Sequence, residues 1–265
     1  MDNDRFAGLT RSLDTTGSRR DLGRALAGGA LGTLVGSAAG TLDADAKKKR
    51  DKKRKKLKSK TVTRTVRQPV TRTFTSTAPI TIPSAAPGQI NLPASPYPAA
   101  ITISGFTNGV ITDVNLLLTD LTSSYGSDVQ ILLSLDDGRR ALVMSDIGEG
   151  LSVTDIDLRL DDEAAAPLSR TALSSGTFQP TDFASGTNMF PAPAPAPNGN
   201  VALSTFDGAN PNGTWQLWVM TSGGAPGDLG GWALQITAEV DAGTVDERVP
   251  VAKHKKHKKQ GKGRR

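Results

Sequence analysis

The 265-residue chain contains no cysteine, which excludes disulfide bonds, thiolate metal ligands and a cysteine nucleophile. Its only histidines, His254 and His257, lie near the C-terminus, and residues 80–245 contain no lysine. A Ser–His–Asp triad needs a histidine to take the proton from serine. Residues 80–245 offer neither histidine nor a lysine base, so we expect no catalytic residues and no enzymatic activity.

The chain also lacks any sustained helical period, and past residue 46 it has no run apolar enough to span a membrane. Short β-type runs between Gly, Pro, Asp and Asn turns begin at Ile80, among them "AITIS" (100–104), "DVQILLSL" (128–135) and "VTDIDLRL" (153–160). This pattern predicts an all-β protein with a jelly-roll-like antiparallel β-sandwich. The segment "FPAPAPAPNGN" (190–200) is expected to be a polyproline-like surface loop.

The stretch "GTWQLWVMTSGGAPGDLGGWALQI" (213–236) carries two tryptophan-bearing runs of alternating character. It predicts two core strands joined by a Gly-rich turn, with Trp215 and Trp232 filling the interior. Three glycines are expected to provide the geometry of that turn: Gly227, Gly230 and Gly231.

Charge is divided sharply along the chain. Residues 47–72 have 14 Lys/Arg and one acidic residue, residues 80–245 have four Arg and 17 Asp/Glu, and residues 246–265 have nine Lys/Arg and two acidic residues. The three net charges are +13, −13 and +7. We therefore predict a basic, Thr-rich linker over 47–79, an acidic folded domain over 80–245, and a basic disordered tail over 246–265.

The lysine clusters on either side of the acidic domain can bind a polyanion by counterion release. They contain no aromatic residues for base stacking, so sequence-specific nucleic-acid recognition is not indicated. Plain solvation, or folding back onto the acidic domain, is the alternative. The residues expected to contact a polyanion, such as an anionic cell-envelope polymer, are Lys47, Lys48, Lys49, Arg50, Lys52, Lys53, Lys255, Lys256, Lys258 and Lys259.

The first 46 residues have the order of features found in an export signal. Arg19 and Arg20 precede the Ala-, Gly- and Leu-rich run 25–40, and an Ala-x-Ala sequence ends at Ala46. This order resembles a bacterial twin-arginine signal, and it predicts an exported protein that is extracellular or associated with the cell envelope. A short amphipathic helix with a chance arginine pair is the alternative.

Six stretches carry a resemblance to a known family. In order they are "ITIPSAAPGQINLPASPYPAAITISGF", "ITDVNLLLTDLTSSYGSDVQILL", "ALVMSDIGEG", "DIDLRLDDEAAAPL", "SGTFQPTDF" and "LSTFDGANPNGTWQLWVMTSGGAPGDLGGWALQI". Together they resemble the P domain, or Homo B domain, of subtilisin-like proprotein convertases, in its bacterial form. The resemblance implies a jelly-roll β-sandwich that acts as a folding and stability partner of a protease. The chain departs from the family at Ser123–Tyr125, where a histidine followed by Thr-Tyr is frequent, and at 136–138, where Pro-x-Gly is common.

The resemblance also implies a calcium site, since some bacterial P domains resemble Ca²⁺-stabilised modules. Ca²⁺ takes several oxygen ligands from carboxylates and carbonyls, although no EF-hand spacing exists in this chain. Solvated loop carboxylates and Asx turns are the alternative interpretation. The candidate ligands lie at predicted strand ends within the family-like stretches: Asp128, Asp146, Asp161 and Asp162.

Two functional hypotheses follow. In the first, the chain is an exported, non-catalytic binding or structural module whose basic segments engage anionic surfaces. In the second, it is an accessory or stabilising domain that acts in trans with a separate subtilisin-like serine endopeptidase. A carbohydrate-binding sandwich ranks below both, because the sequence indicates no exposed aromatic platform.

Overall fold

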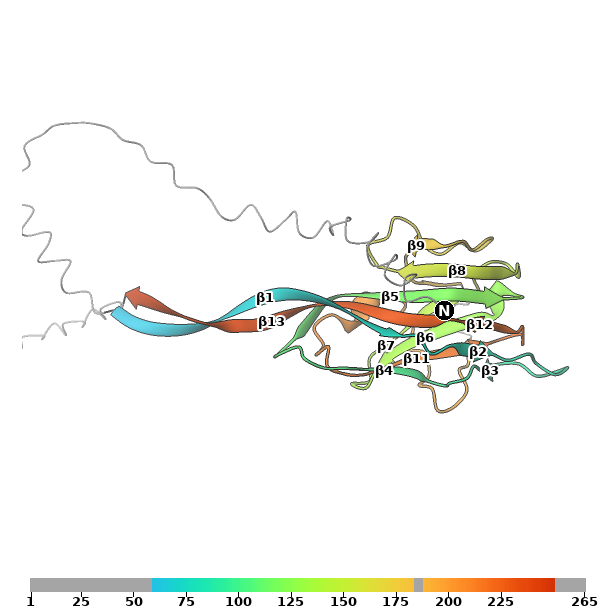
Figure 1. The fold of residues 1–265 in the computed structure, drawn as a ribbon, viewed down its shortest axis with the longest axis horizontal. Coiled ribbons are helices and arrows are strands. Elements are labelled where there is room, and N and C mark those ends of the chain that lie inside the picture. Colours follow the sequence, from blue (N-terminus) through green and yellow to red (C-terminus); the bar gives the residue numbers. More distant parts are fainter. Residues whose placement is uncertain (1–58, 184–187, 251–265) are drawn as a thin grey trace, which may run out of the picture. The chain divides into compact units, whose positions relative to one another are not determined.

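Two β-sheets pack against each other, as the alternating sequence pattern predicts (Figure 1). The computed structural model describes residues 59–183 and 188–250. The first sheet contains β1 (Ser59–Ser76), β2 (Ile80–Ile82), β5 (Val110–Ser123), β8 (Val153–Leu160), β9 (Gly176–Phe178), β12 (Gly227–Leu229) and β13 (Gly231–Pro250). The second contains β3 (Leu92–Pro93), β4 (Ala99–Ile103), β6 (Val129–Leu135), β7 (Arg140–Ser145), β10 (Thr181–Asp182) and β11 (Gly213–Thr221). Two 3-10 helices, η2 (Gly126–Asp128) and η3 (Leu203–Phe206), lie in the connections.

The first sheet has the order β1-β13-β5-β12-β2, with β8 paired to β5 and β9 paired to β8. The second has the order β10-β7-β6-β11-β3, with β4 also paired to β11. The β8–β9 and β10–β7 pairs are parallel, so each sheet is mixed rather than purely antiparallel. These pairs are short, and the long central pairs of both sheets are antiparallel, as expected.

The core lies between the two sheets and is built from alternating strand residues. Trp215 on β11 and Trp232 on β13 are both fully buried in it, which confirms their predicted place. β6 is buried along its whole length because it lies between β7 and β11 and is covered on both faces. Its odd-numbered residues, such as Ile131, face the core, whereas Leu132 packs on the opposite side of the sheet.

The Trp-bearing stretch 213–236 is not a simple hairpin. β11 belongs to the second sheet and β13 to the first, so the chain crosses the sandwich between them. The connection is not only a turn, because it includes β12, which pairs with β5 and β2. Gly227 is required here by a close approach rather than by turn geometry: its φ is not in the left-handed region, and a Cβ would collide with the backbone carbonyl of Thr122.

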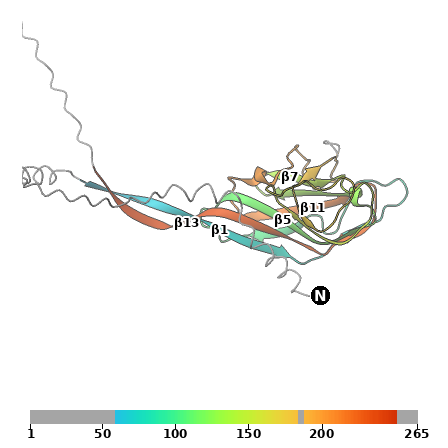
Figure 2. The same ribbon diagram turned by 90° about the horizontal axis from the view of Figure 1, so that it is seen from above.

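The predicted linker 47–79 contains a long strand, which is the main departure from the sequence interpretation. β1 pairs with β13, which in turn continues to Pro250, beyond the start of the predicted tail. The two strands run side by side in both views (Figure 1 and Figure 2). A basic, Thr-rich linker is expected to be solvated. Instead, Val70 and Phe74 pack against the core, and Arg67 and Arg72 bind backbone carbonyl groups.

The Pro-rich segment 190–200 lies over the outer face of the second sheet. It covers a second apolar cluster of Leu132, Leu142 and Trp218, against which Phe190 packs. The backbone N–H of residue 194 donates a hydrogen bond to the carbonyl oxygen of residue 191 (3.1 Å), so a turn interrupts the expected polyproline-like conformation. The segment therefore acts as a cover for the sheet.

Candidate functional site

The predicted ligand Asp146 lies in an acidic environment at the end of β7. The parallel pair β10–β7 sets Asp182 opposite Ser145, next to it. Burial, followed by the charges of Asp182 and Asp128, raises the pKa of Asp146, while the guanidinium of Arg170 acts in the opposite direction. Neighbouring carboxylates disfavour each other's charged form. A bound cation would offset this repulsion between negative charges.

Asp128, the second predicted ligand, ends the 3-10 helix η2. Its carboxylate accepts a hydrogen bond from the backbone N–H of Ala225 (3.2 Å) and lies against Gly223, where a Cβ would be too close. Its backbone carbonyl accepts a hydrogen bond from the N–H of Ser222 (2.8 Å). Asp128 thus attaches the segment after β11 to the start of β6.

Asp161 and Asp162 follow β8 and serve different structural roles. The Asp161 carboxylate accepts a hydrogen bond from the N–H two residues later (2.9 Å), an Asx turn, and lies 3.3 Å from Nε of Arg159. The Asp162 carboxylate accepts hydrogen bonds from the backbone N–H groups of Leu203 (2.9 Å) and Ser204 (2.7 Å) at the start of η3. The alternative interpretation, loop carboxylates that bind local N–H groups, describes this pair well.

The four predicted ligands are therefore not assembled as one site. The charge of Asp128 contributes to the raised pKa of Asp146, and within residues 59–183 and 188–250 no group of three or more His, Asp or Glu side chains is arranged to hold a metal ion. The sequence analysis missed Asp182, whose distance along the chain from Asp146 gives no signal; only the parallel β10–β7 pair brings them together. Calcium binding stays a prediction.

The ten residues predicted to bind a polyanion lie outside the described residues: Lys47, Lys48, Lys49, Arg50, Lys52, Lys53, Lys255, Lys256, Lys258 and Lys259. Two arginines of β1, Arg67 and Arg72, have defined partners. Arg67 donates to the carbonyl oxygens of Asn108 and Glu239, and its Nε lies 3.7 Å from the carboxylate of Asp241. Arg72 donates to a carbonyl oxygen and lies 4.9 Å from the ring centroid of Phe106. These two arginines attach β1 to the acidic domain.

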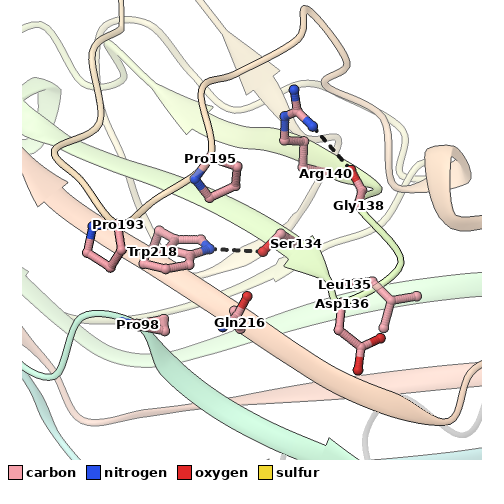
Figure 3. Close-up of a pocket in the computed structure, with 10 residues that line it drawn as sticks. All are labelled: Pro98, Ser134, Leu135, Asp136, Gly138, Arg140, Pro193, Pro195, Gln216 and Trp218. Atoms are coloured by element: carbon pink, nitrogen blue, oxygen red, sulfur yellow. Dashed lines mark hydrogen bonds between the residues drawn. The ribbon is translucent and has the colours of Figure 1, made fainter.

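One pocket, with a volume of about 440 Å³, opens on the outer face of the second sheet (Figure 3). Its lining combines proline rings with polar side chains and one indole: Pro98, Ser134, Leu135, Asp136, Gly138, Arg140, Pro193, Pro195, Gln216 and Trp218. The indole N–H of Trp218 donates to the hydroxyl of Ser134 (2.9 Å), and Arg140 donates to the carbonyl of Gly138 (3.2 Å).

The polar groups of the pocket hold its own walls. Arg140 also donates to the carbonyl oxygen of Ala196 in the Pro-rich segment, and Asp136 accepts from the backbone N–H of Thr214 (2.8 Å). Trp218 is only 4% exposed, so its ring offers little surface for stacking on a sugar or a base. These hydrogen bonds explain how the Pro-rich segment is held on the sheet. They do not indicate a ligand for the pocket.

Comparisons with models of protein families and with curated proteins found no match for this chain. Within the part of the chain that the structure describes, no helix is long and apolar enough to cross a membrane.

Proposed function

We propose that this chain is an exported, non-catalytic module resembling a P domain, which binds anionic polymers of the cell envelope through its basic segments. The division of charge carries this proposal. Residues 47–58 and 251–265 have net charges of +9 and +8, whereas residues 80–245 have a net charge of −13 and no lysine. Such basic segments bind polyanions by releasing condensed counterions.

The structure of the sandwich supports a separate role for these segments. The core of the sandwich extends from Val70 to Val240, and the arginines of β1 that lie nearest to it have partners within the acidic domain. Among the described residues the core is therefore built within 70–240, and the residues proposed to bind a polyanion lie outside this range in the sequence.

Salt-dependent binding tests this proposal. The full chain should bind linear polyphosphate, and log K should fall linearly with log[salt], with a slope of about −0.7 for each charge neutralised. A variant that lacks residues 47–58 and 251–265 should lose most of the affinity and of the slope. Equal binding by the two proteins would contradict a role for the basic segments.

The absence of catalysis is part of the same proposal. It is supported by the lack of histidine and lysine in residues 80–245, which leaves no imidazole or amine base for a serine nucleophile. The purified chain should not hydrolyse peptide substrates. Turnover that persists through further purification and is lost on mutation of a residue in this chain would overturn the proposal.

A second candidate, an accessory to a separate subtilisin-like protease, is favoured by one exposed apolar surface. Tyr125 and Leu151 are 52% and 55% exposed. They lie in neighbouring loops, because the N–H of Gly126 donates to the carbonyl of Leu151 (2.8 Å) and Gly150 lies against the Tyr125 ring. Co-purification of such a protease from the native host, lost in the Tyr125→Ser/Leu151→Ser variant, would support this role. If the native chain, with its basic segments intact, retained no protease in this experiment, the first proposal would be favoured.

A further inference from the structure

The chain contains the dipeptide Asn-Gly three times, and the structure places the three asparagines in different surroundings. They are Asn108, Asn198 and Asn212. In this dipeptide the asparagine side chain is easily attacked by the backbone nitrogen of the next residue, because glycine has no Cβ to hinder the approach. Which asparagine reacts in the folded protein depends on the hydrogen bonds that hold its side chain and the following glycine.

Asn108 and Asn212 are held by hydrogen bonds at the groups that would react. Nδ2 of Asn108 donates to the Asp241 carboxylate (2.7 Å). The N–H of Gly109, which is buried, donates to the carbonyl oxygen of Phe106 (3.4 Å). Nδ2 of Asn212 donates to the same carbonyl oxygen (2.7 Å), and its Oδ1 accepts from the Phe106 N–H (3.0 Å). Attack by the glycine nitrogen at either asparagine would have to break these bonds.

Asn198 lies in the Pro-rich segment and is exposed, as are Gly199 and Asn200 after it. Its Oδ1 accepts a hydrogen bond from the backbone N–H of Asn200 (3.2 Å). This donor faces the oxygen on which negative charge develops when the side-chain carbonyl is attacked. Across the described ranges, neither Nδ2 of Asn198 nor the N–H of Gly199 has a hydrogen-bond partner, and the Cβ position of Gly199 is open. Hydrogen bonds therefore hold neither the attacking nor the leaving nitrogen.

We propose that Asn198 is a site of spontaneous deamidation, and that the isoaspartate formed there loosens the Pro-rich segment from the second sheet. The backbone nitrogen of Gly199 loses its proton to solvent and forms a bond with Cγ of Asn198. The bond between Cγ and Nδ2 breaks, Nδ2 takes up a proton and leaves as ammonia, and a succinimide ring remains. Water then adds to one of the two ring carbonyls and the C–N bond of that carbonyl breaks, which gives aspartate or isoaspartate.

Residue 198 lies between two points at which the Pro-rich segment is attached to β7. Nε of Arg140 donates to the carbonyl oxygen of Ala196 (2.5 Å), and the N–H of Leu142 donates to the carbonyl oxygen of Asn200 (2.8 Å). Isoaspartate routes the main chain through its side chain, so the path between these two attachments becomes one methylene longer. The hydrogen bond at Leu142 should then open more often and expose the apolar cluster beneath the segment.

Peptide mapping of the full chain tests the site. The native protein and the protein unfolded in urea would be incubated in mildly alkaline buffer, and the conversion at each Asn-Gly dipeptide would be followed by mass spectrometry. In urea the three sites should react at similar rates, because no folded structure distinguishes them. In the native protein we expect Asn198 to react at least about 10-fold faster than Asn108 and Asn212, because hydrogen bonds must first break at the other two.

Equal rates at the three sites of the native protein would overturn the proposal, because the structure would then not select Asn198. A faster reaction at Asn108 or Asn212 would overturn it as well. So would an Asn198 that reacts in urea but not in the native protein.

Amide hydrogen exchange tests the structural consequence. The matched control is Asn198→Gln, which keeps an amide side chain but reacts far more slowly, because attack on it must close a larger ring. After incubation of the native chain we expect the Leu142 amide to exchange about 2- to 10-fold faster, with no such change in Asn198→Gln. The amides of β5, in the other sheet, should not change in either protein. If isoaspartate forms at residue 198 and the Leu142 amide keeps its original rate, the proposed loosening is wrong.

Discussion

The two halves of β13 show two different ways to hold one strand in place. In residues 231–240, Trp232, Leu234 and Ile236 are completely buried between the sheets, whereas residues 242–246 are exposed on both faces. Hydrophobic burial stabilises the first half by roughly 25 cal/mol for each Å² of apolar surface. The second half depends on pairing with β1, on polar contacts and on the exposed Arg67–Asp241 ion pair, which contribute little in water. We therefore expect the first half to open only on global unfolding and the second to open locally.

The largest expected effect is the loss of a core indole. Trp215→Ala and Trp232→Ala should each lower the free energy of unfolding by about 3–5 kcal/mol, because both side chains are fully buried. Val245→Ala, in the exposed half of β13, should change it by less than about 0.5 kcal/mol. Equilibrium denaturation followed by circular dichroism measures all three. A cost at Val245 close to that at the tryptophans would mean that the two halves form one cooperative unit.

A smaller difference is expected between the two indoles when each is replaced by phenylalanine. The Trp215 N–H donates to the carbonyl of Pro211 (3.1 Å), whereas the Trp232 N–H has no hydrogen-bond partner among the described residues. Trp215→Phe leaves a buried carbonyl without its donor, while Trp232→Phe removes a buried polar group without a partner. Trp215→Phe should therefore be less stable than Trp232→Phe by about 1 kcal/mol, measured by urea denaturation. The reverse order would show that Trp232 has a partner, such as a bound water.

The sequence pattern predicted the β-sandwich well, because alternating apolar residues indicate which side chains of a strand are buried. Trp215, Trp232 and the fully buried strand 129–135 are found where the pattern places them. The pattern failed for β1, whose arginines are typical of a solvated linker. One of their partners, the carbonyl of Glu239, lies 172 residues from Arg67 along the chain, and the carbonyl of Gly105 lies 33 residues from Arg72, so no local sequence pattern indicates these contacts. It failed in the same way for Asp182, which only the pairing of β10 with β7 brings next to Asp146.

The attachment of β1 provides a third, more local prediction. Arg67→Met keeps much of the side-chain volume but removes the hydrogen bonds to the carbonyl oxygens of Asn108 and Glu239 and the ion pair with Asp241. We expect faster amide hydrogen exchange in residues 63–68 and 241–246, with a loss of up to about 1 kcal/mol in local opening free energy. Exchange in β6 should not change. Arg64→Met, on the opposite face of β1, is the matched control and should have the smaller effect.

If Arg67→Met and Arg64→Met had equal effects on hydrogen exchange, the charge of β1 would matter but the specific contacts of Arg67 would not. Raising the salt concentration separates these cases further. Ion pairing with Asp241 weakens as salt screens it, whereas the hydrogen bonds to backbone carbonyl groups persist.

The smallest expected effect concerns Asp146, whose acidic environment disfavours its charged form. Its pKa is raised by burial and by the charges of Asp182 and Asp128, so at a pH between the ordinary and the raised pKa the folded state holds a proton that the unfolded state has released. The stability that this proton confers is complete below the ordinary pKa of an aspartate, and it is lost as the pH rises through the raised pKa. Asp146→Asn should remove this pH dependence and increase the stability at pH 7 by up to about 0.5 kcal/mol.

Asparagine also tolerates the left-handed backbone of Asp146 (φ 53°), so the substitution should introduce no backbone strain. Thermal unfolding between pH 3.5 and 7 measures the effect, with Asp228→Asn, an exposed carboxylate on β12, as the control. Adding CaCl₂ then tests the predicted metal site, because a cation bound by Asp146 would raise the Tm of the native chain but not that of Asp146→Asn. If Ca²⁺ raised the Tm of both proteins equally, the cation would bind elsewhere. The carboxylates around Asp146 would then only destabilise the folded state locally, a cost that the large core of the sandwich offsets.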